Sequence, residues 1–439
     1  MRTEQPGRAR KLAEDPAAAV VALRARAWAR LVRTVALAAA LVVLPAVVLP
    51  TTAGAAPSSV QVRYSWPESV GGPDCSARNP LTCGYTNAFV RLVNALPAWS
   101  GVGARPQAWV SFYSVNQPRI RTALLAADAR GVAVHLVTWR IKTKDTGLPS
   151  DHLGVDLTGE LKAMVEGLAL SDHSTVTVCQ GSCFAGGNAG RQHAKLLATA
   201  DPVAKEYRVM SGSGNSVWQS DDGAWNDWVV ESSKPHYKMV ADYLDRAKKD
   251  RKQKTPKPVK DKALGTTLYL MPVTNDPLLT KLKAVRYRKG CTVRVDMYQA
   301  SGSAVANRYV DRLVKIHKAG CFVRVIGNLA LSGADPAWPP ATIARLQAAG
   351  IEVLDGYRGP RLHMHEKRVV IDAKGVVGDW IGSVNWTRPS IETNMENALW
   401  RNGKAAALEG IAHDDRLARH AQPWVAAPTV PSSKRVPQN

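Results

Sequence analysis

Two kinds of hydrophobic pattern alternate along most of the chain. Residues 107–115 (QAWVSFYSV) and 132–139 (VAVHLVTW) are apolar, β-rich runs that predict strands. Between them, residues 119–131 (RIRTALLAADARG) have the apolar spacing of an amphipathic helix and end at a glycine. Strand, helix, glycine and strand in this order predict a βαβ unit, in which the two strands run parallel and the crossover is right-handed.

The same succession returns in the second half of the chain. Residues 291–299 (CTVRVDMYQ) and 321–328 (CFVRVIGN) predict two strands, and residues 307–320 (NRYVDRLVKIHKAG) predict the helix between them. Each copy then continues through a further helix and strand to a short strand. In the first copy these are residues 157–180 and the strand that begins with HAK, and in the second copy they are residues 341–356 and the strand that begins with HEK. We therefore expect two copies of one α/β unit.

The duplication divides the chain into five parts. A basic run with nine Lys/Arg and two prolines, RAKKDRKQKTPKPVKDK, separates the copies. We expect it to be a solvated linker, and a lipid- or DNA-contacting role is the alternative. The last residues are polar and predict disorder. The predicted parts are a signal peptide (1–55), a first repeat (56–245), the linker (246–263), a second repeat (264–424) and a tail (425–439).

The N-terminal part has the features of an export signal. Several arginines precede the apolar run Val35–Leu49, and Ala53-Gly54-Ala55 supplies the small residues of a cleavage site. The apolar run is short for a membrane span. We therefore expect a cleaved signal peptide and a secreted protein, with an uncleaved anchor as the alternative.

Composition and charge narrow the class of protein further. The chain has 439 residues and is 45% hydrophobic, which allows a sizeable core and excludes general disorder. Its formal net charge is +22, and residues 1–55 hold eight Lys/Arg and three Asp/Glu, so cleavage would leave +17. Such a charge favours polyanionic partners, either nucleic acid or an anionic membrane. A basic surface that serves only solubility is the alternative.

Six cysteines in an exported chain predict three disulfides, although the sequence alone leaves their connectivity open. Spacing favours the local pairs Cys75–Cys83 and Cys179–Cys183, which leaves Cys291 with Cys321. The last two cysteines begin two strands of one βαβ unit, so they can pair if those strands are neighbours. A metal site is the competing interpretation, but CQGSC has no second Cys/His pair at zinc-like spacing.

A pair of short motifs carries the candidate chemistry. Residues i and i+2 of a strand face the same way, so His365 and Lys367 should present an imidazole and an ammonium side by side. The next strand should bring Ser383 and Asn385 to the same place, after a turn at residues 372–375. Cation, hydroxyl and amide suit the oxygens of a phosphate, and imidazole suits its phosphorus or leaving oxygen. The first copy repeats the set with His193, Lys195, Ser213 and Asn215.

Two imidazoles also match a two-step mechanism. One can attack phosphorus to form a phosphohistidine, while the other protonates the leaving alcohol and then activates water. Each imidazole needs a partner on its second nitrogen. The candidates are Asp227, 12 residues beyond Asn215, and Glu396, 11 residues beyond Asn385. Which carboxylate serves which histidine is left open by the sequence.

At these residues the chain resembles the phospholipase D superfamily and its HKD motif. The second copy reads His365-x-Lys367-x4-Asp372, followed by Gly382-Ser383-x-Asn385. The resemblance covers nearly all of the chain after the signal peptide, as two motif-bearing halves. It implies an α/β fold of two pseudo-twofold-related repeats, each a mixed β-sheet flanked by helices, with one active site at their interface.

The resemblance also implies a reaction and roles for the residues. It implies a phosphodiesterase that needs no metal or other cofactor, with His193 as the nucleophile and His365 as the general acid. The first motif departs from the pattern at Ala200, where Asp is expected, and Asp201 follows directly. The motif aspartate is expected to support the local turn, and a one-residue slip before Pro202 would restore it.

Three functions are weighed. Hydrolysis of phospholipid head groups by a secreted monomer at a membrane surface comes first, because two motifs in one exported chain resemble the secreted bacterial phospholipases D. An extracellular endonuclease is the alternative, since TNMENALW after GSVNW resembles the small nucleases of the superfamily. The third is a catalytically silent cationic protein that binds lipid or nucleic acid. Intact His and Lys in both copies argue against it.

Other residues in or near the two motifs are not expected to take part in catalysis. His363 lacks a lysine two residues on and is expected to line the entrance beside His365. Ser213 and Ser383 lack the G-x-S-x-G surroundings of a serine hydrolase. Five tryptophans lie around the motifs, namely Trp218, Trp225, Trp228, Trp380 and Trp386. Most are expected in the core, and a place in the lining of a lipid or base pocket is the alternative for one or two of them.

Overall fold

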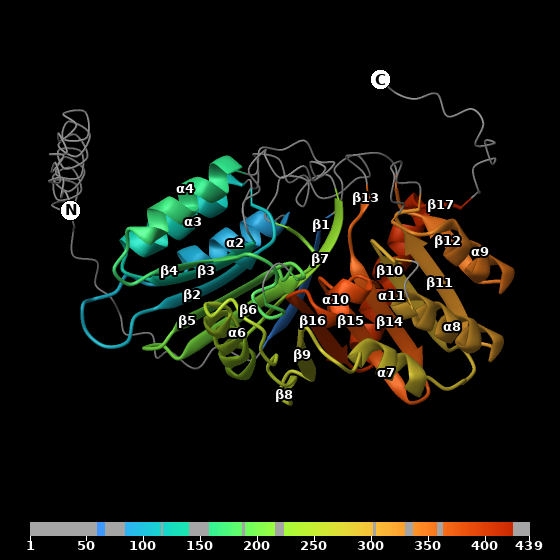
Figure 1. The fold of residues 1–439 in the computed structure, drawn as a ribbon. Helices are drawn as coiled ribbons and strands as arrows, with labels where there is room; N and C mark the ends of the chain where they lie inside the picture. The colour runs from blue at the N-terminus through green and yellow to red at the C-terminus, as the bar shows by residue number, and fades with distance from the viewer. Residues whose placement is uncertain are drawn as a thin grey trace, which may run out of the picture. The chain divides into compact units, whose positions relative to one another are not determined.

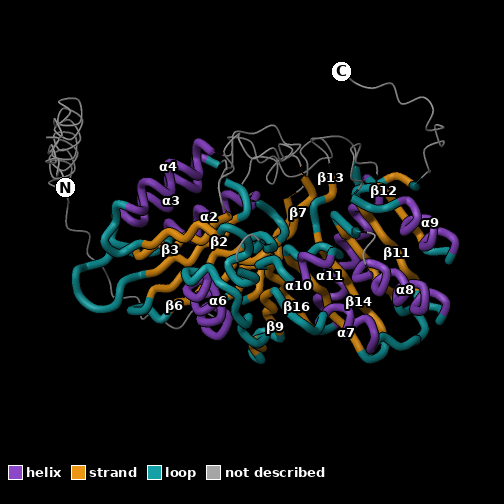
Figure 2. Tube along the Cα trace, in the orientation of Figure 1, coloured by secondary structure: helices purple, strands orange, loops and turns teal. Residues whose placement is uncertain are grey.

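Two mixed β-sheets form the framework of the protein (Figures 1 and 2). The computed structural model describes residues 59–65, 84–115, 117–139, 158–186, 189–215, 224–301, 304–329, 337–357 and 363–424. All of them belong to one compact unit, Ala55–Asn439. The predicted signal peptide, the Cys75–Cys83 pair, Trp218 and the predicted tail lie outside the described residues.

The main elements follow one another in the same order in both halves. The first half contains β1 (Val60–Ser65), α2 (Gly84–Asn94), β2 (Gln107–Phe112), α3 (Pro118–Ala129), β3 (Ala133–Trp139), α4 (Thr158–Ala169), β4 (Thr175–Cys179), β5 (Leu196–Asp201), β6 (Glu206–Gly212), β7 (Ala224–Glu231) and α6 (Lys234–Ala247). The second half contains β8 (Val259–Asp261), β9 (Thr266–Met271), α7 (Pro277–Ala284), β10 (Thr292–Met297), α8 (Ala304–Lys318), β11 (Phe322–Gly327), α9 (Pro340–Ala348), β12 (Glu352–Asp355), β13 (His363–Met364), β14 (Lys367–Ala373), β15 (Val376–Gly382), α10 (Arg388–Glu392), β16 (Glu396–Asn402), α11 (Lys404–His420) and β17 (Gln422–Pro423). The short elements β8, β13, α10 and β17 are the additions of the second half.

Strand order confirms the predicted duplication. The first sheet runs β4-β3-β2-β5-β6-β7-β1, and the second contains the matching series β12-β11-β10-β14-β15-β16-β9. In each series the first three strands are parallel, as the βαβ pattern predicts, and the rest are antiparallel. The fold class predicted from the sequence is therefore confirmed, with mixed sheets flanked by helices.

Hydrophobic periodicity explains which face each helix covers. Helices α2, α3 and α4 bury residues such as Phe89 and Leu124 on one face of the first sheet. Helices α7, α8 and α9 do the same on the second sheet. Helix α6 covers the other face of the first sheet, in a core that also includes Ile381 and Leu399 of the second half. The two halves therefore share a hydrophobic core.

Helix starts in the structure follow ordinary capping rules. The Ser233 and Asp276 side chains accept hydrogen bonds from backbone N–H groups in the first turns of α6 and α7, and a proline occupies an early position in both helices. The predicted linker is not all loop, because β8 lies within it and pairs with β9. Val259 packs against the shared core, which explains why a strand forms there.

Helix α11 covers a layer of buried charges, in addition to the apolar contacts that Leu417 makes near its end. Asp379 of β15 accepts hydrogen bonds from Arg368 (2.6 Å) and Arg401 (2.6 and 2.9 Å), and the carboxylate and the Arg368 side chain are fully buried. Arg401 also pairs with Glu409 of α11 at 2.7 Å. The Tyr64 hydroxyl of β1 accepts from Arg368 at 3.0 Å. This layer ties α11, the second sheet and a strand of the first half together.

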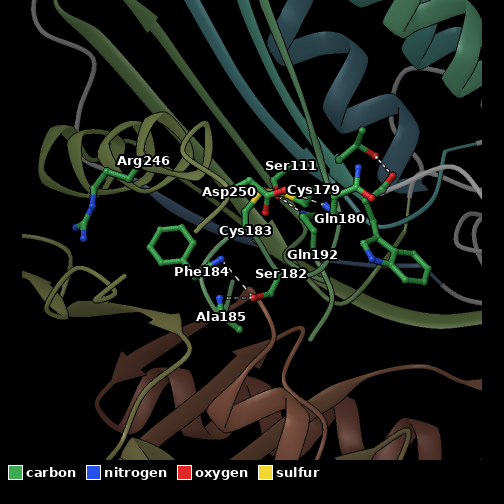
Figure 3. Close-up of a disulfide and its surroundings, with 12 residues drawn as sticks. Ser111, Cys179, Gln180, Ser182, Cys183, Phe184, Ala185, Gln192, Arg246 and Asp250 are labelled. Atoms are coloured by element: carbon green, nitrogen blue, oxygen red, sulfur yellow. Dashed lines mark hydrogen bonds between the residues drawn. A yellow bond between two sulfur atoms is a disulfide. The ribbon is translucent and has the colours of Figure 1, made fainter. Parts of the chain in front are cut away.

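Two of the predicted disulfides lie within the described residues, and both are confirmed. Cys291 and Cys321 join the starts of β10 and β11, which are parallel neighbours. Cys179 and Cys183 close a short loop after β4 (Figure 3). In that loop Ser182 N donates to Ala189 O at 3.0 Å, so the loop braces the segment that leads to the first motif.

The expected burial of the tryptophans around the motifs is confirmed for those that the structure describes. Four of the five tryptophans noted above are buried, with exposed fractions of 0–2%, namely Trp225, Trp228, Trp380 and Trp386. Among the helices that the structure describes, none combines the length and apolar character that a bilayer span requires.

Candidate active site

The first motif is held in place by the second half of the chain. His193 and Lys195 lie in the segment that enters β5, just before the strand begins. His193 N donates to Met395 O at 2.9 Å, and Lys195 N donates to the Asn397 side-chain oxygen at 2.7 Å. Both acceptors lie at or beside the start of β16. The motif is therefore positioned across the junction between the halves.

The second motif is held in the reciprocal way. His365 lies between β13 and β14, and its N–H donates to Trp225 O at 2.9 Å. The strand β13 pairs with β7 of the first half. The predicted i, i+2 pairing within one strand is thus only partly correct, because Lys367 begins β14 while His365 precedes it. Each motif therefore contacts a strand of the other half, β16 for the first motif and β7 for the second, and both motifs lie where the two halves meet.

Each imidazole contacts a side chain of the opposite half, and the two contacts differ in charge. His193 Nδ1 donates to Glu396 Oε2 at 2.7 Å, whereas His365 Nδ1 donates to Asn226 Oδ1 at 2.8 Å. Because both acceptors occupy Nδ1, the lone pair of Nε2 is left for chemistry on each ring. One histidine therefore has a carboxylate partner and the other has a neutral amide.

The prediction that Asp227 orients a histidine is wrong. Neither of its carboxylate oxygens has a hydrogen-bond partner among the described residues, and the side chain is fully buried. Adjacent strand residues point to opposite faces, so Asn226 faces His365 while Asp227 points away. Burial, followed by repulsion from Glu366, raises the pKa of Asp227 to about 7.

The spacing could have identified Asn226. It lies 11 residues beyond Asn215, the same interval that separates Glu396 from Asn385. Asp227 instead corresponds to Asn397, and the N–H groups of both donate to a motif serine, at 3.1 and 3.0 Å. The first half therefore has an amide followed by an acid, Asn226-Asp227, where the second half has an acid followed by an amide, Glu396-Asn397.

Two buried ammonium groups face two tyrosines. Lys195 and Lys367 are 0% exposed, and each Nζ donates to the backbone oxygen of its own motif histidine at 2.6 Å. The Lys195 ammonium lies 5.6 Å from the ring centre of Tyr113, and that of Lys367 lies 4.7 Å from the ring centre of Tyr298. No motif in the sequence points to these tyrosines, although Tyr113 directly follows β2 and Tyr298 directly follows β10.

Burial and mutual repulsion lower the pKa values of the motif histidines and lysines. Burial lowers the pKa of His193 to about 4, against the opposing charge of Glu396. Burial and then Lys367 lower the pKa of His365 well below its ordinary value, with smaller contributions from Lys195 and His193. Burial also lowers the pKa of Lys195 to about 7. An anion placed among these groups would offset their mutual repulsion, so the site favours an anionic ligand.

Burial and attraction compete at Glu396. Burial alone would raise its pKa, but the charge and hydrogen bond of His193, together with Lys195 and Ser383, outweigh this effect. The pKa of Glu396 therefore lies below its ordinary value. The group is an ionised partner for the His193 ring.

The motif serines have a different role from the predicted one. Ser383 Oγ donates to the Glu396 carboxylate, and Ser213 Oγ donates to Asn226 Oδ1 at 3.2 Å. Both hydroxyls therefore orient the residue that holds the opposite histidine, rather than binding phosphate directly. The side chains of Asn215 and Asn385 are 9% and 6% exposed, and their amide oxygens have no hydrogen-bond partner among the described residues. These two residues remain candidate phosphate contacts.

The predicted slip at Ala200 does not occur. In the strand pairing Ala200 is opposite Gln107, just as Asp372 is opposite Thr292, and both partners begin the first strand of their unit. Asp201 caps the β5–β6 turn by accepting from two backbone N–H groups at 3.0 and 3.1 Å. Asp372 instead pairs with Arg288 and Lys404. Neither aspartate lies at the site, because a strand of several residues separates each from its motif lysine.

The comparison with protein families finds a match in the second half of the chain. Residues 285–413 match the family described as "Cardiolipin synthase, PLD-like domain". This range includes the second motif and Glu396. No curated protein matches the chain.

Two solved structures with TM-scores above 0.5 show the same fold at low sequence identity. A polyphosphate kinase from Porphyromonas gingivalis is 13% identical with a TM-score of 0.53, covering 86% of this chain and 51% of its own. The chain therefore spans about half the length of that kinase. A phosphatidylserine synthase from Haemophilus influenzae Rd KW20 is 10% identical with a TM-score of 0.51, covering 77% of this chain and 85% of its own. The phospholipase D family member Nuc from Salmonella typhimurium is 19% identical, covers 37% of this chain and 98% of its own, and has a TM-score of 0.29.

Proposed function

Since the chain belongs to the phospholipase D superfamily, we propose that it is a phosphodiesterase that works through a covalent phosphohistidine. The observation that carries this proposal is the reciprocal arrangement at the junction. His193 contacts Glu396, His365 contacts Asn226, and each buried motif lysine donates to the backbone oxygen of its own histidine. The arrangement supplies two cations for a phosphate and two imidazoles with different partners.

In the first step Nε2 of His193 attacks phosphorus, and a P–N bond forms as the P–O bond to the leaving alcohol breaks. His365 donates its Nε2 proton to the departing oxygen, so the alcohol leaves neutral. Lys195 and Lys367 stabilise the charge on the non-bridging oxygens of the transition state. Both lysines are 0% exposed, and their charges act more strongly there than in water.

In the second step water replaces histidine on phosphorus. The now neutral His365 accepts a proton from water, whose oxygen attacks the phosphohistidine, and the P–N bond breaks. Neutral His193 and protonated His365 are regenerated, and a phosphomonoester is released. The proton is returned to its starting place, so the cycle balances without any co-reactant.

The partners of the two rings support this division of roles. Phosphorylation makes the His193 ring cationic, and ionised Glu396 on its Nδ1 stabilises that cation. Asn226 on His365 has no net charge, so it does not hold a proton on Nε2 as strongly. His193 is therefore suited to attack and His365 to donate a proton.

Phospholipid head groups are the proposed substrate, and the protein is proposed to act outside the cell. The N-terminal export pattern and the presence of two motifs in one chain support this proposal. The two disulfides within the described residues agree with an oxidising compartment. A membrane surface is the corresponding partner, and the positive net charge favours anionic lipid.

An endonuclease is the second candidate, and the net charge of +22 is the observation that favours it. The third possibility, a silent binding protein, is weakened because both histidines and both lysines are in place, and because Ala200 lies away from the chemistry. Release of choline from phosphatidylcholine vesicles tests the first candidate, and nicking of a supercoiled plasmid tests the second. No turnover of any phosphodiester would support the third.

Chelation is expected to leave the rate unchanged. The charge on the phosphate is met by two lysine ammonium groups, and the described residues contain no cluster of three His, Cys, Asp or Glu side chains suited to a metal. Hydrolysis of bis(p-nitrophenyl) phosphate is measured after dialysis against EDTA and again after adding Mg²⁺ or Zn²⁺. A loss of activity that a metal restores would contradict the proposed mechanism.

The pH dependence of kcat/KM is expected to change in the variant Asn226→Asp. His365 must be protonated to donate, so kcat/KM for an alkyl phosphodiester falls as the pH rises through its pKa, which is lowered. A carboxylate at residue 226 favours the charged ring and moves this limb about 1–3 pH units higher. The acidic limb reports neutral His193, near pH 4, and should move less.

A change of leaving group provides the control for this variant. A p-nitrophenolate leaves without a proton, so with that ester the alkaline limb due to His365 should be absent in both proteins. An Asn226→Asp profile that coincides with the parent profile for the alkyl ester would show that residue 226 does not set the proton affinity of His365.

A further inference from the structure

A guanidinium lies beside the proposed nucleophile and has no part in the mechanism above. Arg191 is two residues before His193, and its side chain is exposed. Its Nη1 donates to the Tyr113 hydroxyl at 3.3 Å, and the guanidinium lies 5.5 Å from the ring centre of Trp139. Tyr113 in turn stacks on Trp139 at 5.2 Å and meets the His193 ring edge-on at 5.1 Å. We call Arg191, Tyr113 and Trp139 the arginine wall.

The backbone of Arg191 is fixed by the opposite half. Its N–H donates to the Asn394 side-chain oxygen at 3.0 Å, and its carbonyl accepts from Met395 N at 2.9 Å. Gly190 approaches so closely that an added Cβ would lie 2.4 Å from Thr393 O. The guanidinium is therefore presented from a rigid backbone, which lowers the entropy lost when it binds a ligand.

Among the described residues, the wall has no equivalent beside His365. The residue two before His365 is His363, whose ring lies 6.4 Å from that of Tyr298 and 5.9 Å from that of His365. A permanent cation therefore stands beside one histidine, and an imidazole stands beside the other. The pseudo-twofold symmetry that relates the motifs is broken where a substrate would extend beyond its phosphate.

We propose that the arginine wall is a subsite for a second anionic phosphate carried by the substrate next to its scissile phosphodiester. The proposal rests on the phospholipid function above and narrows it to lipids with two phosphate groups. A guanidinium presents a planar fork of N–H donors that matches phosphate oxygens. The same cation repels the quaternary ammonium of choline, so zwitterionic lipids are the poorer substrates.

The exposure of the aromatic rings favours a lipid over a nucleic acid strand. Proteins that bind single strands stack bases on open aromatic faces. Trp139 is only 9% exposed, with Tyr113 stacked on it and Arg191 beside it. The ring therefore holds the arginine in place and does not offer a platform for a base. What the wall presents outward is charge, and the matching ligand is a phosphate.

The test compares three lipids in detergent micelles at equal surface concentration: cardiolipin with two phosphodiesters, phosphatidylglycerol with one, and zwitterionic phosphatidylcholine. The wild-type kcat/KM should be highest for cardiolipin. Arg191→Gln should lower the cardiolipin value about 10- to 100-fold and bring the cardiolipin-to-phosphatidylcholine ratio toward one. Arg191→Lys, which keeps the charge but loses the fork, should give an intermediate ratio.

The matched control is Arg388→Gln, which removes the same charge from an exposed arginine paired with Glu392 outside the wall. Its lipid ratio should equal that of the wild type. The proposal is overturned if the wild type shows no preference for cardiolipin, if Arg191→Gln lowers all three values equally, or if a single-stranded oligonucleotide is cleaved better than every lipid. Failure of the wild type to hydrolyse bis(p-nitrophenyl) phosphate would instead overturn the proposed function itself.

Discussion

Replacing His193 by alanine is expected to reduce the hydrolysis of every phosphodiester by about 10⁴- to 10⁶-fold, because the proposed covalent intermediate forms on this ring. His365→Ala should lower the rate by about 10²- to 10⁴-fold for an alkyl leaving group. With a p-nitrophenyl leaving group its first step should be nearly normal. Water activation then becomes limiting, so one equivalent of p-nitrophenol should appear as a burst.

The two variants together test the assignment of roles. His365→Ala quenched in alkaline denaturant, which preserves the P–N bond, should carry a phosphoryl ester on a histidine, which mass spectrometry of the peptide containing His193 would detect. Tyr357→Phe, a change in a loop residue outside the proposed catalytic groups, controls for handling of the protein. If His193→Ala gives the burst and His365→Ala does not, nucleophile and acid are exchanged. If neither substitution affects turnover, the site lies elsewhere.

Replacing Asp379 by alanine is expected to lower the free energy of unfolding by about 3–5 kcal/mol. This carboxylate accepts from Arg368 and Arg401, whose side chains are 0% and 8% exposed. Without it, two guanidinium groups remain buried with too little negative charge around them. Denaturation in urea, followed by circular dichroism, measures the loss.

Asp311→Ala is the control for that measurement. Asp311 pairs with Arg345 at the surface, where the side chains are 56% and 44% exposed, and solvent screens the pair. Its loss should cost less than about 1 kcal/mol. Equal unfolding free energies for the two variants would mean that Asp379 does not stabilise the layer beneath α11. Asp379→Asn, which keeps an acceptor of the same shape, should lie between them.

The sequence predicted the repeat because periodicity is a local property. Strand runs with a helix between them were visible at 107–139 and 291–328, and the order of strands in the two sheets agrees with that pattern. The pair Cys291–Cys321 followed, since both residues begin adjacent strands of one unit. His193, Lys195, His365 and Lys367 were found because the motif occurs twice, which chance rarely supplies.

The partners of those residues depend on contacts between the halves. Charge alone favours Asp227 over Asn226 as the partner of a histidine, but strand alternation turns Asp227 away from the site. The motif serines were assigned to phosphate, yet they bond to the residues that orient the opposite histidines. The charged layer under α11 was also missed, because its members come from β1, β14, β15, β16 and the helix, far apart in sequence.

The amino-acid sequence by itself determined the duplicated α/β unit and the residue types that can handle a phosphate, because hydrophobic periodicity and motif spacing are set within a few turns or strands. Only the tertiary structure decided which acid or amide meets which imidazole, and where Arg191 stands. Those contacts join residues about 140 to 200 positions apart in the chain, such as His365 with Asn226 and His193 with Glu396. Such pairings arise when two surfaces pack together, so the spacing within one motif marks the candidate partner but not the histidine that it meets.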